Sequence, residues 1–183
     1  KEMSVFPDHV CFMQPSPFLK PVEKVVYLDF ETDQTSGEHV PVYCFLKWVF
    51  ASGESGSREF GIHENVREEV GEFLFNNKSW KGMFDGAVVV AHNMKGFDGC
   101  FLLQYLVENN LKPTNVLVTG TKLIAFTVSR RRMRIIDSLS FLPMPLSDLT
   151  KAFGLDTASY STGFFPHFFT RKDRFKYVGP LPS

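Results

Sequence analysis

Two carboxylates at the end of an apolar segment are the residues of this chain best suited to chemistry. Asp29 and Glu31 close the segment 25–31 and are separated by one residue. Alternate side chains of a strand point the same way, so both acids are expected on one side of a sheet. Two like charges held together are costly unless a cation lies between them, and Mg²⁺ or Mn²⁺ is the usual partner of carboxylate oxygens. The alternative is that both acids only end a buried strand, because so short a motif also arises by chance.

A second group of polar residues follows another apolar run, over 87–91. His92 and Asn93 come directly after this run, and Asp98 stands where a helix is expected to begin. A structural alternative exists for two of them, since Asp98 is a suitable N-cap and Asn93 a suitable turn residue. Asp98 nevertheless adds a third carboxylate at the end of a central element, and three such carboxylates can converge on one site.

Hydrophobic periodicity predicts a mixed α/β domain. A three-stranded antiparallel meander is expected first, followed by a helix, a strand buried on both faces, a second helix and further strands. The expected strands lie over 25–31, 42–50, 58–62, 87–91, 115–119, 123–128 and 134–137, and the expected helices over 65–77, 99–110 and 144–153. The domain is assigned to residues 25–155, with an extended, proline-containing arm over 1–24 and a C-terminal extension over 156–183.

Composition limits the class of protein. At 183 residues and 44% hydrophobic content, the chain suits one folded domain. A net charge of zero gives no support for strong electrostatic binding to nucleic acid. The dense basic segment 130–134 can meet phosphate or form a solvated hairpin face. Three widely spaced cysteines, no signal peptide and no apolar stretch of transmembrane length together predict an intracellular location without membrane contact.

Four segments resemble, in order and spacing, the exonuclease region of family B DNA polymerases. Residues 29–32 (D-F-E-T) and 93–98 (N-M-K-G-F-D) resemble its first and second exonuclease motifs. The residues at these positions are similar to those of the protein-primed branch, which contains phage, adenovirus, linear-plasmid and Polinton transposon enzymes. Residues 135–146 resemble that branch's D-S-L…L-P-x-P segment, and residues 163–180 are similar to the Polinton type in particular. The resemblance covers about residues 9–183, which is nearly the whole chain.

The resemblance implies a ribonuclease H-like 3′–5′ exonuclease fold, with a mixed central sheet flanked by helices. It also implies that Asp29, Glu31 and Asp98 are catalytic residues that bind two divalent ions, Mg²⁺ or Mn²⁺, for hydrolysis of a phosphodiester bond. The expected ligand is the 3′ end of single-stranded DNA, and its expected contact residues are Thr32, Asn93, Phe97, Phe101, Ser138 and Leu139. Amides and hydroxyls can hydrogen-bond to sugar and phosphate, whereas Phe and Leu can stack or wedge against bases. For Phe97 and Phe101 the alternative is packing in the core.

The chain departs from the family pattern at two places. The third exonuclease motif of the family, Y-x-x-x-D, supplies a fourth acid and a tyrosine, and no such motif is found up to Ser183. Protein-primed enzymes carry lysine before the glycine that matches Gly163, where this chain has Thr162. With three acids of four, the second metal ion is expected to be held poorly and the rate to be low.

Two functions of different classes follow from these residues. The first is the 3′–5′ exonuclease (proofreading) domain of a protein-primed, Polinton-like transposon DNA polymerase in the nucleus, working beside the polymerase domain of the same parent chain. The second is a catalytically decayed or domesticated exonuclease fold that acts as a nucleic-acid-binding or protein-interaction module. The missing fourth acid and Thr162 favour the second function, whereas the three retained acids with Asn93 and Ser138 favour the first.

Overall fold

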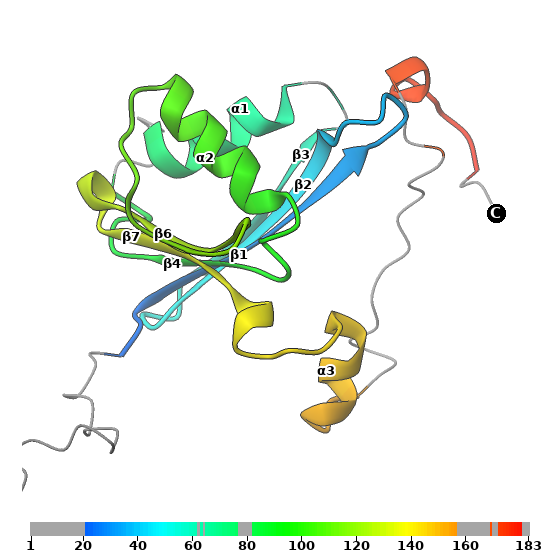
Figure 1. Cartoon of the computed structure of the whole chain (residues 1–183). Helices are drawn as coiled ribbons and strands as arrows, with labels where there is room; N and C mark the ends of the chain where they lie inside the picture. The colour runs from blue at the N-terminus through cyan, green and yellow to red at the C-terminus, as the bar shows by residue number, and fades with distance from the viewer. Residues whose placement is uncertain are drawn as a thin grey trace, which may run out of the picture.

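The computed structural model of the chain describes residues 21–61, 63, 65–76, 82–156, 169 and 172–180. Most of the expected N-terminal arm and of the C-terminal extension lies outside these ranges. Within them, the chain folds into one sheet with two helices on one side and a third helix on the other (Figure 1). None of the described helices is long and apolar enough to cross a membrane.

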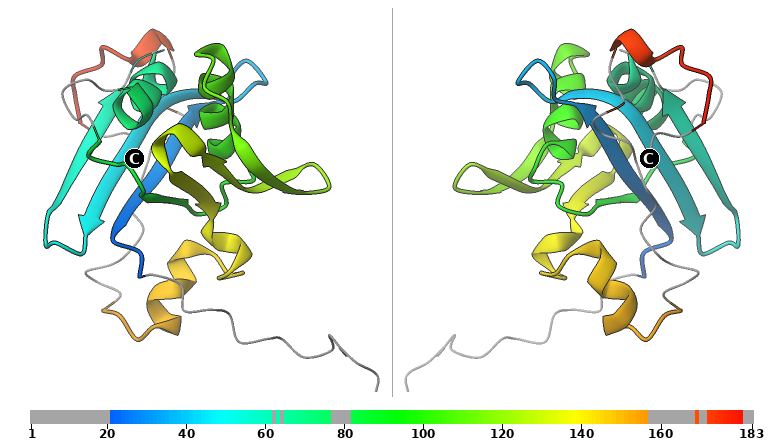
Figure 2. Two further views of the ribbon diagram at one scale, coloured as in Figure 1. Left: turned by 90° about the vertical axis from the view of Figure 1, so that its left-hand side faces the viewer. Right: turned by 90° about the vertical axis from the view of Figure 1, so that its right-hand side faces the viewer.

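The sheet has seven strands in the order β3-β2-β1-β4-β7-β6-β5. β4 lies at the centre and runs parallel to β1 and β7, whereas the other neighbours are antiparallel. The β5–β6 hairpin extends from one side of the sheet (Figure 2). This arrangement confirms the expected mixed sheet and its opening meander. The strands are β1 (Lys24–Asp33), β2 (Val40–Phe50), β3 (Ser55–Gly61), β4 (Val88–Ala91), β5 (Thr114–Thr119), β6 (Lys122–Val128) and β7 (Met133–Asp137).

Three α-helices accompany the sheet in the described ranges: α1 (Val66–Gly71), α2 (Asp98–Glu108) and α3 (Leu146–Ala152). α1 widens into a π-helical turn over Glu72–Asn76, so the helix expected here is confirmed in position but is not regular throughout. α3 begins directly after Pro145, as the prolines before it predict.

β1 separates the apolar core from the more open face of the sheet. Its buried side chains Val26, Leu28 and Phe30 belong to the core cluster that α1 and α2 cover. Tyr27 and Asp29 alternate with them and are exposed on the opposite face. The period of two therefore places the predicted acid on the side of the sheet that α1 and α2 leave open.

A register shift in the β1–β2 ladder lies between Glu31 and Thr32. Such irregularities bend a strand and re-aim its side chains. Strict alternation would turn Asp33 the same way as Asp29, yet Thr32 and Asp33 are both buried. At the end of β1, Asp29 and Glu31 therefore lie toward the open face, whereas Thr32 and Asp33 are both buried.

The basic segment 130–134 covers the turn between β6 and β7 and the first two residues of β7, and one of its arginines is structural. Arg131 Nε donates to the Phe75 carbonyl at 2.8 Å, and its Nη1 contacts Asp85 Oδ1 at 3.3 Å. The other three arginines are exposed. They fit the solvated-hairpin alternative, and their contact with phosphate stays a prediction.

α1 and α2 meet at a glycine. A Cβ atom placed on Gly71 would overlap the ring of Tyr105, so the close approach of the two helices requires glycine there. The ring is also held at its hydroxyl, which accepts from Asn76 Nδ2 at 2.9 Å and donates to Glu72 Oε2 at 3.2 Å. The ring therefore has little freedom to make room for a larger residue.

We expect Gly71→Ala to destabilise the protein by about 1–3 kcal/mol, although alanine is the better helix former, because the added methyl group has to displace the Tyr105 ring. The free energy of unfolding in urea measures this change. Val107→Ala on the same helix pair is the matched control, because Val107 is 67% exposed and its truncation is expected to cost less than about 0.5 kcal/mol. A Gly71→Ala protein as stable as the wild type would contradict this packing.

Candidate active site

Asp98 connects the start of α2 to the end of β1. Its Oδ1 accepts a hydrogen bond from the Phe30 backbone N–H at 3.0 Å, and the side chain is only 4% exposed. The N-cap position of α2 is Phe97, and no side chain caps the helix. The N-cap alternative for Asp98 is therefore wrong: its carboxylate is turned toward β1 rather than toward the amides of its own second and third turn positions.

The carboxylates of the first two motifs interact electrostatically. The pKa of Asp98 is raised from its ordinary value of 3.8 to about 7. Burial is the main cause, the charges of Asp29 and Glu31 add to it, and the hydrogen bond from the Phe30 N–H acts in the opposite direction. Burial also raises the pKa of the Cys44 thiol, with Asp98 and Asp29 adding to the effect. The fold thus concentrates negative charge at the end of β1, where a proton or a cation would relieve it.

Asp29 opens onto a pocket of about 340 Å³ on the face of the sheet opposite α1 and α2. The pocket also receives Tyr27 and Phe45 from the sheet, His92 from the end of β4, and Ser138 from the segment after β7. α3 supplies apolar residues to its wall. The structure therefore brings one predicted acid and one predicted nucleic-acid contact to the same cavity, beside aromatic surface.

The acids do not form a ready-made metal centre. Across the ranges that the structure describes, no three His, Cys, Asp or Glu side chains are grouped closely enough to hold an ion together. Oxygen donors of the kind that Mg²⁺ and Mn²⁺ prefer are nevertheless present in the three coupled carboxylates. The residue types therefore fit such an ion, although the three side chains are not grouped around one point in this structure.

His92 fixes the position of Ser138. Its Nε2 lies 3.0 Å from the Met144 carbonyl, which can only accept, so Nε2 carries a proton. Its Nδ1 lies 3.0 Å from Ser138 Oγ, which in turn lies 3.3 Å from the Ala91 carbonyl. The end of β4 is thereby tied to the segment that precedes α3, and the Ser138 hydroxyl already has two protein partners.

Asp137, the last residue of β7, is a fully buried acid to which the motif comparison gave no role. Its Oδ1 accepts from the backbone N–H of Met94 at 3.2 Å and of Leu139 at 3.0 Å, and its Oδ2 lies 3.4 Å from Ser140 Oγ. The D-S-x-S sequence is a signal for the local part of this arrangement, because an aspartate often accepts from the amide two residues on. The contact with Met94 lies 43 residues away and has no local signal.

The remaining predicted contact residues fall into two groups. Thr32 and Phe97 come together through His39, whose Nδ1 lies 3.3 Å from Thr32 Oγ1 and whose ring stacks on Phe97 with centroids 4.9 Å apart. Asn93 is exposed and has a φ of 65°, so its conformation is the left-handed one that asparagine tolerates in turns. Ser138 is half-buried on the other side of β4, beside His92. Sequence reasoning did not find His39.

Thr32 is only 3% exposed, and Phe101 and Leu139 are also less accessible than their expected roles suggest. Phe101 is 7% exposed and packs edge to face on Phe30 with ring centroids 5.4 Å apart, so it fits the core-packing alternative. Leu139 is half-buried, and its N–H is bound to Asp137. Contact of either side chain with nucleic acid stays a prediction.

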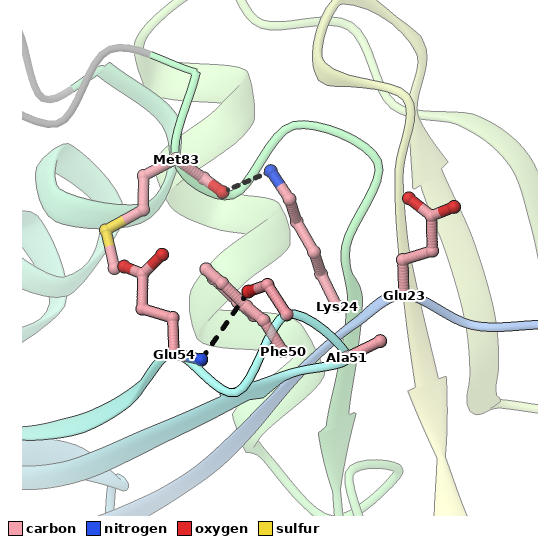
Figure 3. Close-up of a pocket in the computed structure, with 7 residues that line it drawn as sticks. Glu23, Lys24, Phe50, Ala51, Glu54 and Met83 are labelled. Carbon is pink, nitrogen blue, oxygen red and sulfur yellow. Dashed lines mark hydrogen bonds between the residues drawn. The ribbon is translucent and has the colours of Figure 1, made fainter.

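A second pocket, of about 420 Å³, lies at the opposite end of β1 and receives none of the predicted site residues. Lys24 extends along it toward Met83, beside Phe50 and Glu54 (Figure 3). The Lys24 ammonium donates to the Met83 carbonyl at 2.7 Å and lies 5.3 Å from the centre of the Phe50 ring. This cation is already engaged by the protein, so the chemistry expected from the sequence belongs to the other end of the strand.

Asp98 is expected to make metal-free stability depend on pH. The pKa of Asp98 is higher in the folded state than in the unfolded state, so protonation of this carboxyl stabilises the fold. The stabilisation is complete below the ordinary pKa of 3.8 and is lost as the pH rises to about 7. In EDTA, the free energy of unfolding of the wild type relative to Asp98→Asn should fall by about 2–3 kcal/mol between pH 5 and pH 8. Asp148→Asn, an exposed acid on α3, is the control and should show no such trend. A constant difference between wild type and Asp98→Asn would contradict the raised pKa.

Replacement of Asp137 should separate its acceptor role from its charge. Asp137→Ala leaves the Met94 and Leu139 N–H groups without their acceptor and is expected to cost about 2–4 kcal/mol of stability in urea unfolding. Asp137→Asn retains a carbonyl oxygen at that position and should recover about half of the loss or more. Equal losses in the two variants would show that the amide contacts do not carry the effect.

Comparison with known proteins agrees with the geometry. A protein described as a probable DNA polymerase, from Agaricus bitorquis, is 29% identical over 164 residues, which are 88% of this chain and 17% of that protein. Phi29 DNA polymerase, solved with primer-template DNA and incoming nucleotide substrates, has a TM-score of 0.61 at 18% identity over 87% of this chain and 27% of its own. The chain therefore spans less than a third of either relative.

A second solved structure extends this likeness to the archaea. The family B DNA polymerase of the hyperthermophilic archaeon Pyrobaculum calidifontis has a TM-score of 0.52 at 16% identity, covering 82% of this chain and 21% of that one. At such identities the likeness shows the fold alone. It confirms the expected ribonuclease H-like arrangement of a mixed sheet and flanking helices.

A family model identifies the chain more closely. The model described as DNA polymerase type B, organellar and viral, matches residues 67–182, which contain Asp98, Asp137 and the network around His92. The match covers more than half of the sequence and confirms the family to which the motifs pointed. The chain belongs to the organellar and viral type B DNA polymerases.

Proposed function

We propose that this chain is the 3′–5′ exonuclease domain of a protein-primed DNA polymerase and removes nucleotides from the 3′ end of single-stranded DNA. One observation carries the proposal: the Asp98 carboxylate is buried against the end of β1, where it accepts from the Phe30 N–H and lies near Asp29 and Glu31. Burial first, and the charges of these two acids second, raise its pKa to about 7. A structural scaffold gains nothing from an arrangement that burial and like charges both oppose. A metal-dependent hydrolase needs it, because the bound cation offsets both costs.

Three carboxylates would hold the divalent ions. Asp98 would be the fixed ligand, because the Phe30 N–H already orients its Oδ1. Asp29 and Glu31, on the open side of β1, would supply the adjustable ligands. Mg²⁺ or Mn²⁺ bound there polarises a phosphodiester and lowers the pKa of water. The chain has Thr162 where protein-primed enzymes carry a lysine, so that cation would not assist the three acids and activity would be reduced.

The residues around the acids suit a single strand of DNA. Thr32 and Asn93 would hydrogen-bond to its sugar and phosphate groups, and Phe97 would stack against a base. The pocket beside Asp29 has the aromatic surface of Tyr27 and Phe45 for the terminal nucleotide. Phi29 DNA polymerase, which shares this fold, has been solved with single-stranded DNA, and this supports DNA as the ligand.

A binding function without catalysis is the second candidate, and one observation favours it. The acids within the described ranges are not grouped as a metal centre, so Asp29 and Glu31 would have to approach Asp98 for an ion to bind. A chain that no longer hydrolyses DNA could keep the strand-binding groups while its acids drift apart. The two candidates differ in the role of Asp29. An exonuclease needs Asp29 for hydrolysis, whereas in a binding module Asp29 only contributes negative charge near the bound strand.

The test is release of nucleotides from a 3′-labelled single-stranded oligonucleotide in Mn²⁺. We expect slow release by the wild type and a loss of about a thousandfold or more in Asp29→Ala, because ligands of one metal site act as a unit. Glu54→Ala is the matched control. Glu54 is an exposed acid that lines the pocket beside Lys24 at the start of β1. This end of the strand is five residues from Asp29, or roughly 17 Å at about 3.3 Å per residue.

The outcomes separate the candidates. Loss of release in Asp29→Ala with normal release in Glu54→Ala supports the exonuclease. Binding of the oligonucleotide without release by the wild type supports the second candidate. Neither binding nor release in any variant would contradict both.

A further inference from the structure

His39, at the end of the β1–β2 turn, contacts two predicted strand-binding residues that lie far apart in the sequence. Its Nδ1 lies 3.3 Å from Thr32 Oγ1 at the end of β1. Its ring stacks on Phe97, in the loop before α2, with ring centroids 4.9 Å apart and planes inclined by 25°. One exposed imidazole therefore bridges the segments that carry the first and second motifs.

The polar contact fixes the Thr32 hydroxyl. Thr32 Oγ1 also accepts from Gln34 Nε2 at 3.3 Å, so the oxygen is held from two sides. Whichever ring nitrogen of His39 carries the proton, the pair orients the hydroxyl of Thr32, which lies directly after the register shift of β1. Loss of the imidazole would leave Gln34 as the remaining side-chain partner of Thr32 within the described part of the chain.

The stacking contact extends an aromatic row from the surface to the core. The Phe97 ring contacts Phe101 with centroids 5.7 Å apart, and Phe101 contacts Phe30 at 5.4 Å. Phe101 and Phe30 are buried and fixed, whereas Phe97 is half-buried. His39 covers the free side of Phe97 and so limits the angles that its ring can take up.

We propose that His39 is a positioning residue for the bound strand: it holds the buried Thr32 and the half-buried Phe97, which directly neighbour Glu31 and Asp98 in the sequence, in a fixed relation. The proposal rests on the proposed function, because it takes single-stranded DNA as the ligand of both residues. A positioning residue of this kind affects how tightly the strand is held and leaves the carboxylates unchanged. Its loss should therefore weaken binding more than it slows the chemical step.

Three substitutions separate the two contacts. His39→Phe keeps an aromatic ring for Phe97 but removes the hydrogen bond, and His39→Asn keeps a polar group near Thr32 but removes the ring. His39→Ala removes both. Thr35→Ala is the matched control, because Thr35 is exposed in the same turn and only its backbone N–H is bound, to Asp33 Oδ1.

Binding is measured with a fluorescein-labelled oligodeoxythymidylate of ~10 nucleotides, by fluorescence anisotropy in Ca²⁺. We expect binding about threefold to fivefold weaker in His39→Phe and in His39→Asn, and about tenfold weaker in His39→Ala. Thr35→Ala should bind as the wild type does. In Mn²⁺, the KM for release should rise by similar factors while kcat stays within about twofold.

Each outcome decides between the claims. A wild type that binds, together with His39 variants that bind equally well, overturns the role of His39 and leaves the proposed function standing. A fall in kcat without a change in KM or Kd also overturns it. A wild type that neither binds nor hydrolyses the oligonucleotide overturns the proposed function and this inference with it. Near-ultraviolet circular dichroism checks folding, and the two single-contact variants serve if His39→Ala does not fold.

Discussion

The hydrogen bond between the Phe30 amide and the Asp98 carboxylate determines where this chain can do chemistry. β1 and β4 pair up to Tyr27 and Val90, and β1 continues beyond the last pair. The Phe30 N–H that points into this gap needs a partner, and Asp98 supplies it from the start of α2. The partner of the Phe30 N–H is thus a buried carboxylate near Asp29 and Glu31. The hydrogen bond satisfies the backbone, but burial and the neighbouring charges make the ionised form of Asp98 unfavourable.

The loop between β4 and α2 is held at both ends and in its middle. His92 ties its beginning to Ser138 and the Met144 carbonyl, and Asp137 accepts from Met94. Asp98 ties its end to β1. Contacts with three other segments hold this loop in place. They can therefore keep Asn93 in its left-handed backbone conformation even though the loop itself does not favour it. Such rigidity is what a site that aligns a flexible strand of DNA requires.

The sequence predicted the elements well and the contacts between them poorly. Alternation along β1 correctly placed Asp29 on the face opposite Phe30, and the apolar run before His92 correctly predicted a central strand. The N-cap alternative that the sequence left open for Asp98 was wrong, because the partner of this carboxylate is the Phe30 N–H, 68 residues away and beyond any local pattern. Asp137 and His39 were missed for the same reason: their roles arise from contacts with Met94 and Phe97, which only the folded chain brings near.

Paramagnetic broadening by Mn²⁺ of the carboxyl carbon signals in a nuclear magnetic resonance spectrum tests the central claim most directly. If the acids at the end of β1 form one metal site, the signals of Asp29, Glu31 and Asp98 should broaden first, while that of Glu54 at the far end of β1 stays sharp. Uniform broadening of all carboxylates, or selective broadening elsewhere with these three unchanged, would contradict the assignment of this site to metal-dependent hydrolysis.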